Sequence, residues 1–472
     1  MEMLPDDVLL MVLKELKEAA DIFACRLVCK RLAAVALDPY VWRGRAVNST
    51  EPYCACPVLR LVPCLEQVHI NLPAERCRQW AYASTRCAAA KLWMDVDVQD
   101  TSHASHAAAI ICRQEMLGRL KQVVIQLVNF KMATDVPMLL STLASTSRLE
   151  KLRVVLDTGT GDDQHPLPAT PAPILGSIVV TPSLIKFHCK LCTFMEPFVK
   201  FILFEHAVTL ERVNLGTSPS SLTLTSIAPL LTGVTNLSKL TCCCLPGMEA
   251  LAACKALAIL RLFVNTDILD QHAVAGVAEL LRRAEHLREV SLEYEPALLS
   301  VAEVGAELVP ALASGRSRVE TLFITNFEPG QEENFPLLQP VVSALPSLPA
   351  LRHLRMDENT DSPDELLLFI RPDVAPALQR VDLNLLEGCV HSWLHGDTVK
   401  TVFSANPLLH ISLEYVNLVC DDDKRCQACE LDCHGELRDS VFVPYFFSHD
   451  PKDECSEDHS SDSSNRWFHL PL

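Results

Sequence analysis

Apolar residues near the N-terminus recur at helical spacing. Pro5 and two aspartates, Asp6 and Asp7, stand just before or within the start of this pattern, where a missing N–H is tolerated and negative charge favours the positive end of a helix dipole. The apolar positions that follow are three or four residues apart and predict one apolar stripe on an amphipathic helix. They are Val8, Leu9, Val12, Leu13 and Leu16.

A second segment of the same kind, "DIFACRLVCKRLAAVALDPYVW", begins at Asp21. Its apolar residues also recur at helical spacing, and the Asp38-Pro39 pair predicts a turn before Trp42. Together the two segments predict three short helices. A core of this size is too small to be stable alone, so we expect a neighbour to cover its remaining apolar face.

The two segments resemble an F-box. The shared features are a Leu-Pro start, an acidic residue, an aliphatic pair, a second helix ending in Val-Cys-Lys, and an Asp-Pro turn before Trp. The resemblance covers residues 1–46. Leu32 stands where an aromatic residue is frequent and Val41 where leucine is frequent, but both remain apolar.

The resemblance implies that this region binds a Skp-family adaptor, which joins F-boxes to a cullin-RING ubiquitin ligase. Carried over position by position, the adaptor-binding residues, at or immediately behind the interface, are Leu4, Pro5, Val8, Leu9, Leu13, Val28, Cys29 and Trp42. The alternative is a helical cap that only closes a larger core.

Beyond residue 60 the chain repeats a short pattern with apolar residues at its first, fourth and sixth positions. Thirteen segments follow it, from "LEQVHI" at 65 and "AAKLWM" at 89 to "LQRVDL" at 378 and "LLHISL" at 408. Alternation at the fourth and sixth positions predicts a strand with one buried face. Intervening segments such as "VPMLLSTLAS" and "HAVAGVAELLRRA" have helical periodicity.

One strand and one helix per repeat predict an α/β solenoid, in which neighbouring repeats bury each other. Residues 60–420 resemble leucine-rich repeats, with about 12–13 irregular repeats. The turn position after the strand, usually Asn or Cys, holds Cys192, Asn265 or Asn359 in only three of them. The segment "DTGTGDDQHPLPATPAP" predicts a surface loop.

Composition narrows the class of protein. The 472 residues are 49% hydrophobic and 21% charged, with 41 basic and 59 acidic side chains and a net charge of −18. This charge opposes attraction to phosphate, so we expect no nucleic-acid partner. The sequence has neither a basic-then-apolar leader nor a long apolar run, so we expect no membrane partner and a cytoplasmic and/or nuclear location. Most of the twenty cysteines should then be reduced and buried.

Residues 421–472 are acidic and Ser-rich, with 13 acidic and 5 basic side chains, which predicts a short and largely disordered acidic tail. The stretch "CDDDKRCQACELDCH" offers Cys420, Cys426, Cys429, Cys433 and His434. These are zinc-ligand types, but they lie closer together than the two ligand pairs of a usual zinc module. We therefore expect reduced thiols and neither a metal nor a cofactor, with a small zinc site as the alternative.

No nucleophile-elbow, phosphate-loop or zinc-protease motif is present, so we expect a protein that is not an enzyme. The predicted function is that of a substrate-recognition subunit of a Skp-cullin-F-box ubiquitin ligase. In this role the F-box binds the adaptor and the repeats bind an unidentified protein target. The alternative is a repeat scaffold that binds partners without engaging a ubiquitin ligase.

Outward positions of the predicted strands indicate where a target binds. In three successive repeats these positions hold several basic side chains and no acidic one, on the concave face that repeat proteins generally use for binding. The predicted target-binding residues are Lys151, Arg153, Lys186, His188, Lys190 and Arg212. Such a surface suits an acidic or phosphorylated segment, unless it is an ordinary solvated face.

Overall fold

The structure is a computed structural model of the whole chain, and its described residues fall into two compact units. The first unit comprises residues 1–222 and 233–236, and the second comprises residues 223–232 and 237–472. The described residues are 4–48, 55–74, 76–99, 101–129, 135–157, 181–216, 227–265, 271–295, 307–314, 316–326, 338–357, 364–384, 389–414, 420, 426–431, 443–453, 455, 457, 459 and 466–470.

Four short helices begin the first unit. They are α1 (Asp6–Glu15), α2 (Ala19–Arg26), α3 (Lys30–Val35) and α4 (Pro39–Trp42). Three helices were predicted, and the fourth occupies the predicted Asp-Pro turn. It forms because the Asp38 carboxylate accepts a hydrogen bond from the Tyr40 backbone N–H at 2.7 Å, while Pro39 suits a first helical position.

The core of these helices is built around Trp42, which is fully buried. Its indole Nε1–H donates to the Ala36 carbonyl at 2.6 Å, and its ring lies 5.5 Å from that of Phe23 between centroids. Burial of an indole requires such a partner for its N–H. This contact joins α2 and α4.

Arg45 secures the end of α1 to the rest of the unit. Its guanidinium donates to the carbonyls of Lys14 and Lys17 at 2.9 and 3.0 Å, and also to those of Leu13 and Leu16. Carbonyls at a helix C-terminus lack partners within the helix, and a cation there opposes the negative end of the dipole. A single side chain therefore closes α1.

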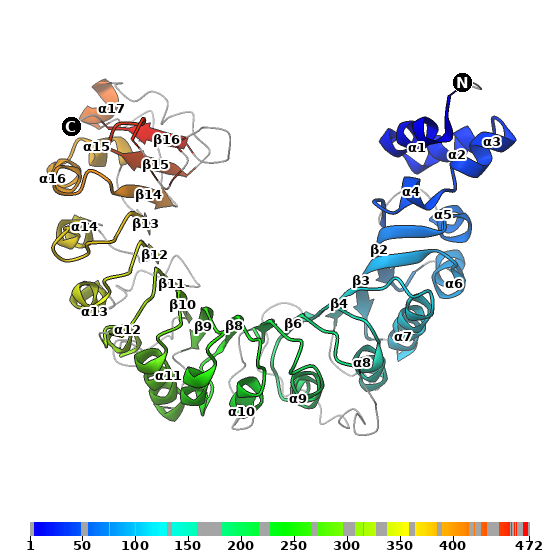
Figure 1. Cartoon of the computed structure of the whole chain (residues 1–472), viewed down its shortest axis with the longest axis horizontal. Helices are drawn as coiled ribbons and strands as arrows, with labels where there is room; N and C mark the ends of the chain where they lie inside the picture. Colours follow the sequence, from blue (N-terminus) through cyan, green and yellow to red (C-terminus); the bar gives the residue numbers. More distant parts are fainter. Residues whose placement is uncertain are drawn as a thin grey trace. The chain divides into compact units, whose positions relative to one another are not determined.

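Seven parallel strands follow in the first unit, each paired with the next in the chain. They are β1 (Ala46–Asn48), β2 (Cys64–Leu72), β3 (Ala88–Asp97), β4 (Gln122–Val128), β5 (Lys151–Asp157), β6 (Lys186–Cys189) and β7 (Arg212–Asn214). Figure 1 shows the connecting helices on one side of these strands. They are α5 (Cys56–Leu61), α6 (Arg76–Ser84), α7 (Thr101–Met116), α8 (Val136–Ser145) and α9 (Glu196–Glu205).

The second unit continues the alternation of strands and helices. Its parallel strands are β8 (Lys239–Cys243), β9 (Ile259–Asn265), β10 (Glu289–Glu295), β11 (Thr321–Asn326), β12 (His353–Asp357), β13 (Arg380–Asn384) and β14 (His410–Glu414). Its helices are α10 (Ile227–Thr232), η1 (Met248–Ala253), α11 (Gln271–Arg283), α12 (Leu308–Leu312), α13 (Leu338–Ala344), η2 (Leu345–Ser347), α14 (Asp364–Phe369), α15 (Val390–Leu394), α16 (Asp397–Ala405) and α17 (Gln427–Leu431).

Each of the thirteen segments with the repeated pattern forms a strand, from β2 to β14. The expected alternation is clear in β5, where Leu152 and Val154 are buried and Arg153 between them is exposed. The two helices predicted from periodicity are α8 and α11. Strand and helix positions therefore follow from the apolar pattern, because each repeat buries one face against its neighbours.

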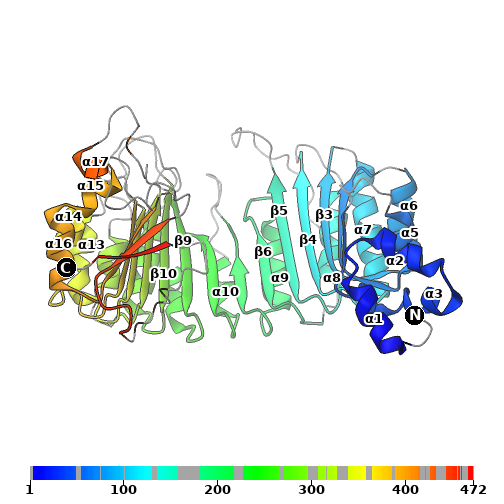
Figure 2. The ribbon, with the colours of Figure 1, turned by 90° about the horizontal axis from the view of Figure 1, so that it is seen from above.

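The C-terminal segment differs from the prediction of a largely disordered tail. Its described residues include α17 and two strands, β15 (Pro444–Phe447) and β16 (Arg466–His469). Strand β15 pairs antiparallel with β14 and parallel with β16, and Figure 2 shows this pair beside the parallel strands of the second unit. The reason is the aromatic cluster of Phe446, Phe447 and Phe468, which are buried and outweigh the acidic composition around them.

Two further expectations concern other parts of the chain. Residues 158–173 of the predicted Gly/Pro/Asp loop lie outside the described residues. Within the described part of the chain, no helix combines the length and the apolar character needed to span a bilayer.

Candidate functional site

The eight residues predicted to bind an adaptor divide into two groups. Leu9, Leu13 and Trp42 are buried within the helical core, and so they support the surface instead of forming it. The other five are exposed: Leu4, Pro5, Val8, Val28 and Cys29. Val8 is 38% exposed and Val28 is 71% exposed. The single apolar stripe predicted for α1 is thus two stripes, one turned to the core and one to solvent.

Three more exposed apolar residues belong to this surface. Met11 and Val12 lie on α1 with Val8, and Leu27 lies beside Val28 at the end of α2, where it is 88% exposed. Val12 was part of the predicted stripe, but the sequence argument did not assign Met11 or Leu27 to the interface. Helical spacing from Val8 to Met11 was the available signal. We call Leu4, Val8, Met11, Val12, Leu27 and Val28 the docking face.

Polar contacts fix the edges of the docking face. The Arg31 guanidinium donates to the Asp6 carboxylate at 2.8 Å and also to the Leu4 carbonyl, which holds the segment before α1 against α3. The Cys29 sulfur accepts a long hydrogen bond from the Leu32 N–H, 3.4 Å between Sγ and N, at the start of α3. Exposed apolar side chains held in place in this way are typical of a protein-binding surface.

The predicted target-binding residues lie together on β5, β6 and β7 or directly after β6. Lys151 is the register partner of Lys186, and Lys186 is the partner of Arg212. Since neighbouring strands are about 4.8 Å apart, these three cations form a row across the sheet. Arg153 and His188 form a second pair in register. We call Lys151, Arg153, Lys186, His188, Lys190 and Arg212 the basic strip.

The charge of the basic strip differs from the prediction at His188. Repulsion by Arg212 lowers the pKa of Lys186, with smaller effects from burial and from Lys151, while Glu211 acts in the opposite direction. Burial, followed by the charge of Arg153, lowers the pKa of His188 to about 4. His188 is therefore neutral at pH 7 and contributes no positive charge, because its imidazole is largely withdrawn from water.

Cysteines near the C-terminus converge in the second unit. Cys420, Cys426 and Cys429 were considered as zinc ligands, and the structure brings them to Cys389, which the sequence argument missed because it lies before β14. Cys433 and His434 are outside the described residues. Hydrogen bonding by the Cys429 backbone lowers the pKa of Cys426 to about 7, whereas burial raises that of Cys429 to about 12.

A second group of potential metal ligands was not anticipated. It comprises His410, His449, Cys455 and His459, which are scattered over the end of the chain. No short motif joins them in the sequence, and only the pairing of β15 with β14 brings them together.

Comparison with known proteins identifies the N-terminal region. Residues 1–47 match the family described as F-box-like, so this part of the chain is an F-box-like domain. The match covers the four helices and the start of β1, and it includes the docking face. It does not extend to the repeated strands and helices.

Other comparisons add little. A search of curated proteins gives no match. Among solved structures, the crystal structure of the Rad7 and Elc1 complex in yeast is similar, with 12% sequence identity, 80% of this chain and 88% of that chain covered, and a TM-score of 0.35. A likeness at this TM-score supports no conclusion about function.

Proposed function

We propose that this protein is a substrate-recognition subunit of a Skp-cullin-F-box ubiquitin ligase. The observation that carries the proposal is the docking face: the F-box-like domain exposes apolar side chains of α1 and of the end of α2. Large apolar side chains exposed on α1 and at the end of α2 favour burial against a partner. The partner of that surface is a Skp-family adaptor, which connects the protein to a cullin-RING ligase.

The remainder of the protein then serves to bind the target. We assign residues 60–420 to irregular leucine-rich repeats, a class that the alternation of parallel strands and helices supports. The outward face of β5–β7 carries the basic strip, and we propose that it receives an acidic or phosphorylated segment of a protein substrate. Among the described residues, none of the five strip lysines and arginines has a salt-bridge partner within 4.0 Å.

The protein itself performs no chemistry in this proposal. It raises the effective concentration of a target near the enzyme that transfers ubiquitin. It would act where ubiquitin ligases of this class work, in the cytoplasm and/or nucleus.

Co-purification tests the proposal. The full-length tagged protein, isolated from cells in the presence of a proteasome inhibitor, should bring down a Skp-family adaptor and a cullin, identified by mass spectrometry. Isolation of ligands without adaptor or cullin would instead identify a repeat scaffold. A variant carrying Val8→Asp and Val28→Asp is the control, because it should lose the adaptor and cullin together.

A further inference from the structure

Two groups of histidine and cysteine side chains in the second unit belong to neither the docking face nor the basic strip. One comprises Cys389, Cys420, Cys426 and Cys429, and the other comprises His410, His449, Cys455 and His459. We propose that each group binds one zinc ion and that the two ions hold the C-terminal segment against the last parallel strands.

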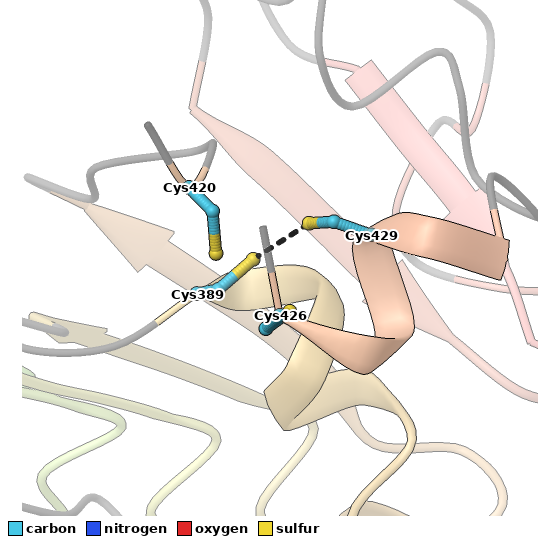
Figure 3. Close-up of side chains that lie close together, drawn as sticks. All are labelled: Cys389, Cys420, Cys426 and Cys429. Atoms are coloured by element: carbon cyan, nitrogen blue, oxygen red, sulfur yellow. Dashed lines mark hydrogen bonds between the residues drawn. The ribbon is translucent and has the colours of Figure 1, made fainter. Parts of the chain in front are cut away.

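The cysteine group is assembled from three separate segments. Cys389 directly precedes α15, Cys420 follows β14, and Cys426 and Cys429 form a Cys-x-x-Cys pair at the start of α17. Figure 3 shows the four side chains gathered between these segments. The Cys-x-x-Cys pair supplies two ligands from one turn, Cys389 supplies one from the preceding repeat, and Cys420 supplies one from the segment between β14 and α17. Four thiolates are a usual ligand set of structural zinc.

Distances between the sulfur atoms fit one tetrahedral ion. All four lie within 4.8 Å of one another, and Cys389 and Cys429 are 3.3 Å apart between Sγ atoms. A disulfide would bring two sulfurs to about 2.05 Å. Four sulfurs at about 2.3 Å from one zinc ion are about 3.8 Å apart. This separation lies between the 3.3 Å from Cys389 Sγ to Cys429 Sγ and the 4.8 Å limit for the whole group.

The histidine group has equally suitable distances. His410 Nε2 lies 2.9 Å from His459 Nε2 and 3.2 Å from Cys455 Sγ, and all four ligand atoms lie within 4.8 Å. Around one tetrahedral zinc ion, two such nitrogens are about 3.4 Å apart, and nitrogen and sulfur about 3.6 Å. Each measured distance is within about 0.5 Å of these values.

Hydrogen bonds outside the group orient two of its imidazoles. His410 Nδ1 lies 3.0 Å from the Gln379 carbonyl oxygen, and His449 Nδ1 lies 3.3 Å from the Pro407 carbonyl oxygen. A carbonyl can only accept, so Nδ1 carries the proton in both rings and Nε2 presents a lone pair to the group. Donation of the second ring N–H to a carbonyl is the usual support of a zinc-bound histidine.

One nitrogen in the histidine group lacks a hydrogen-bond partner among the described residues. This atom, His449 Nε2, is buried. A buried polar atom without a partner is costly. A zinc ion bound by the four side chains would satisfy it, and the stacking of Phe447 on His459, 4.1 Å between ring centroids, would shield the ion from water.

Both sites are structural in character. Each offers four protein ligands and leaves no open position for substrate, which is the arrangement of structural and not catalytic zinc. Binding deprotonates the cysteine thiols and releases their protons to solvent, without oxidation or reduction. The thiols predicted to be reduced and metal-free are in this proposal zinc ligands.

Metal analysis of the full-length protein tests the proposal. Protein purified from zinc-supplemented cells without chelator should contain two zinc ions per chain by elemental mass spectrometry. Cys429→Ser and His449→Ala should each leave one ion, and the double variant none. The matched controls Cys254→Ser and His272→Ala change a cysteine and a histidine outside both groups and should retain two.

A second measurement uses the unaltered protein, so it does not depend on whether variants fold. Cobalt substituted for zinc should give the intense thiolate-to-cobalt absorption of a four-cysteine site, and chelation should lower the unfolding temperature. Wild-type protein without zinc, zinc retained in the double variant, or iron in place of zinc would overturn the proposal. A Cys389–Cys429 disulfide in natively purified protein would overturn the cysteine site. A total of one ion per chain, lost in only one of the two single variants, would overturn the site that the other variant alters.

Discussion

Val8 and Leu9 are consecutive residues of α1 with opposite surroundings: the side chain of Val8 is 38% exposed, whereas that of Leu9 is 4% exposed. Helical geometry turns neighbouring side chains by about 100°, so one contributes to the docking face and the other to the core. A test of adaptor binding must therefore change Val8, because a charge at Leu9 would unfold the domain that presents the surface.

Replacing Val8 and Val28 together by aspartate should weaken adaptor binding by on the order of tenfold or more, because burying charge at an apolar interface costs at least ~1.4 kcal/mol. The unfolding temperature should remain unchanged, since both side chains are exposed. Calorimetric titration with purified adaptor and thermal unfolding measure the two effects. Val208→Asp is the matched control, because Val208 is exposed away from the docking face. Undiminished affinity in the double variant would place the adaptor elsewhere.

Leu9→Ala should behave in the opposite way. Truncating a buried leucine costs about 2–5 kcal/mol of folding free energy, so the F-box-like domain should unfold at lower denaturant concentration. Adaptor affinity should fall only in proportion to the unfolded fraction. Protease sensitivity of residues 1–47, followed with increasing urea, measures this. A stable Leu9→Ala protein that still loses the adaptor would show that Leu9 contacts the partner directly.

Arg45→Lys should destabilise the F-box-like domain although it preserves the charge. Arg45 donates to several carbonyls at the end of α1, and a lysine ammonium cannot reproduce that fork of donors. We expect a loss of about 1–3 kcal/mol, the usual cost of leaving such groups unpaired. Hydrogen exchange of α1 amides provides the measurement. Arg43→Lys is the control, and equal exchange in both variants would contradict the role of Arg45.

Reversing the charge of the basic strip should abolish capture of an acidic or phosphorylated target. The variant changes Lys151, Lys186, Lys190 and Arg212 to glutamate, and capture is measured by pull-down at physiological salt with adaptor binding as an internal reference. The control reverses four exposed cations outside the strip, Arg86, Lys255, Arg316 and Lys452, and so has the same net charge. Equal capture by the two variants would place the target elsewhere.

Stability of the first unit should fall as the pH decreases from about 6.5 to about 4. Burial lowers the pKa of His206 to about 4, and its Nδ1 accepts hydrogen bonds from the Ser183 and Leu184 N–H groups at 3.2 and 3.3 Å. In this window the unfolded chain binds a proton that the folded chain does not, so each pH unit costs about 1.4 kcal/mol.

His206→Asn isolates this contribution, because asparagine offers an acceptor that does not titrate. Urea unfolding at pH 7.5 and pH 5.0 should show a larger loss of stability in the wild-type protein than in the variant. The same loss in both proteins would assign the acid sensitivity to other groups.

Much of the fold is predictable from local pattern. The strands from β2 to β14 follow from apolar alternation, because each repeat buries the same apolar positions against the repeat next to it. Docking-face residues were predicted in part, because helical spacing identifies the apolar positions of α1 but not which of them, Val8 or Leu9, the core takes.

Contacts between distant residues were not predictable. Cys389 joins Cys426 and Cys429 only because α15 and α17 pack together, and the histidine group depends on the return of β15 to β14. The pairing of β15 with β14 could not be predicted from the acidic composition of the C-terminal segment, because charged residues there outnumber the few aromatic residues that stabilise the pairing. His188 was counted as a cation because its burial is a property of the folded sheet.

Arg45 also has a role through its backbone, because its carbonyl accepts hydrogen bonds from the Glu66 and Gln67 N–H groups at 2.8 and 3.3 Å. The residue that closes α1 is thus attached to the first long strand, and the docking face and basic strip belong to the same compact unit. In the proposed function, a target bound at the strip would be held by the same compact unit that binds the adaptor. The position of each lysine on the target's surface, and not its accessibility alone, would then decide which lysines receive ubiquitin.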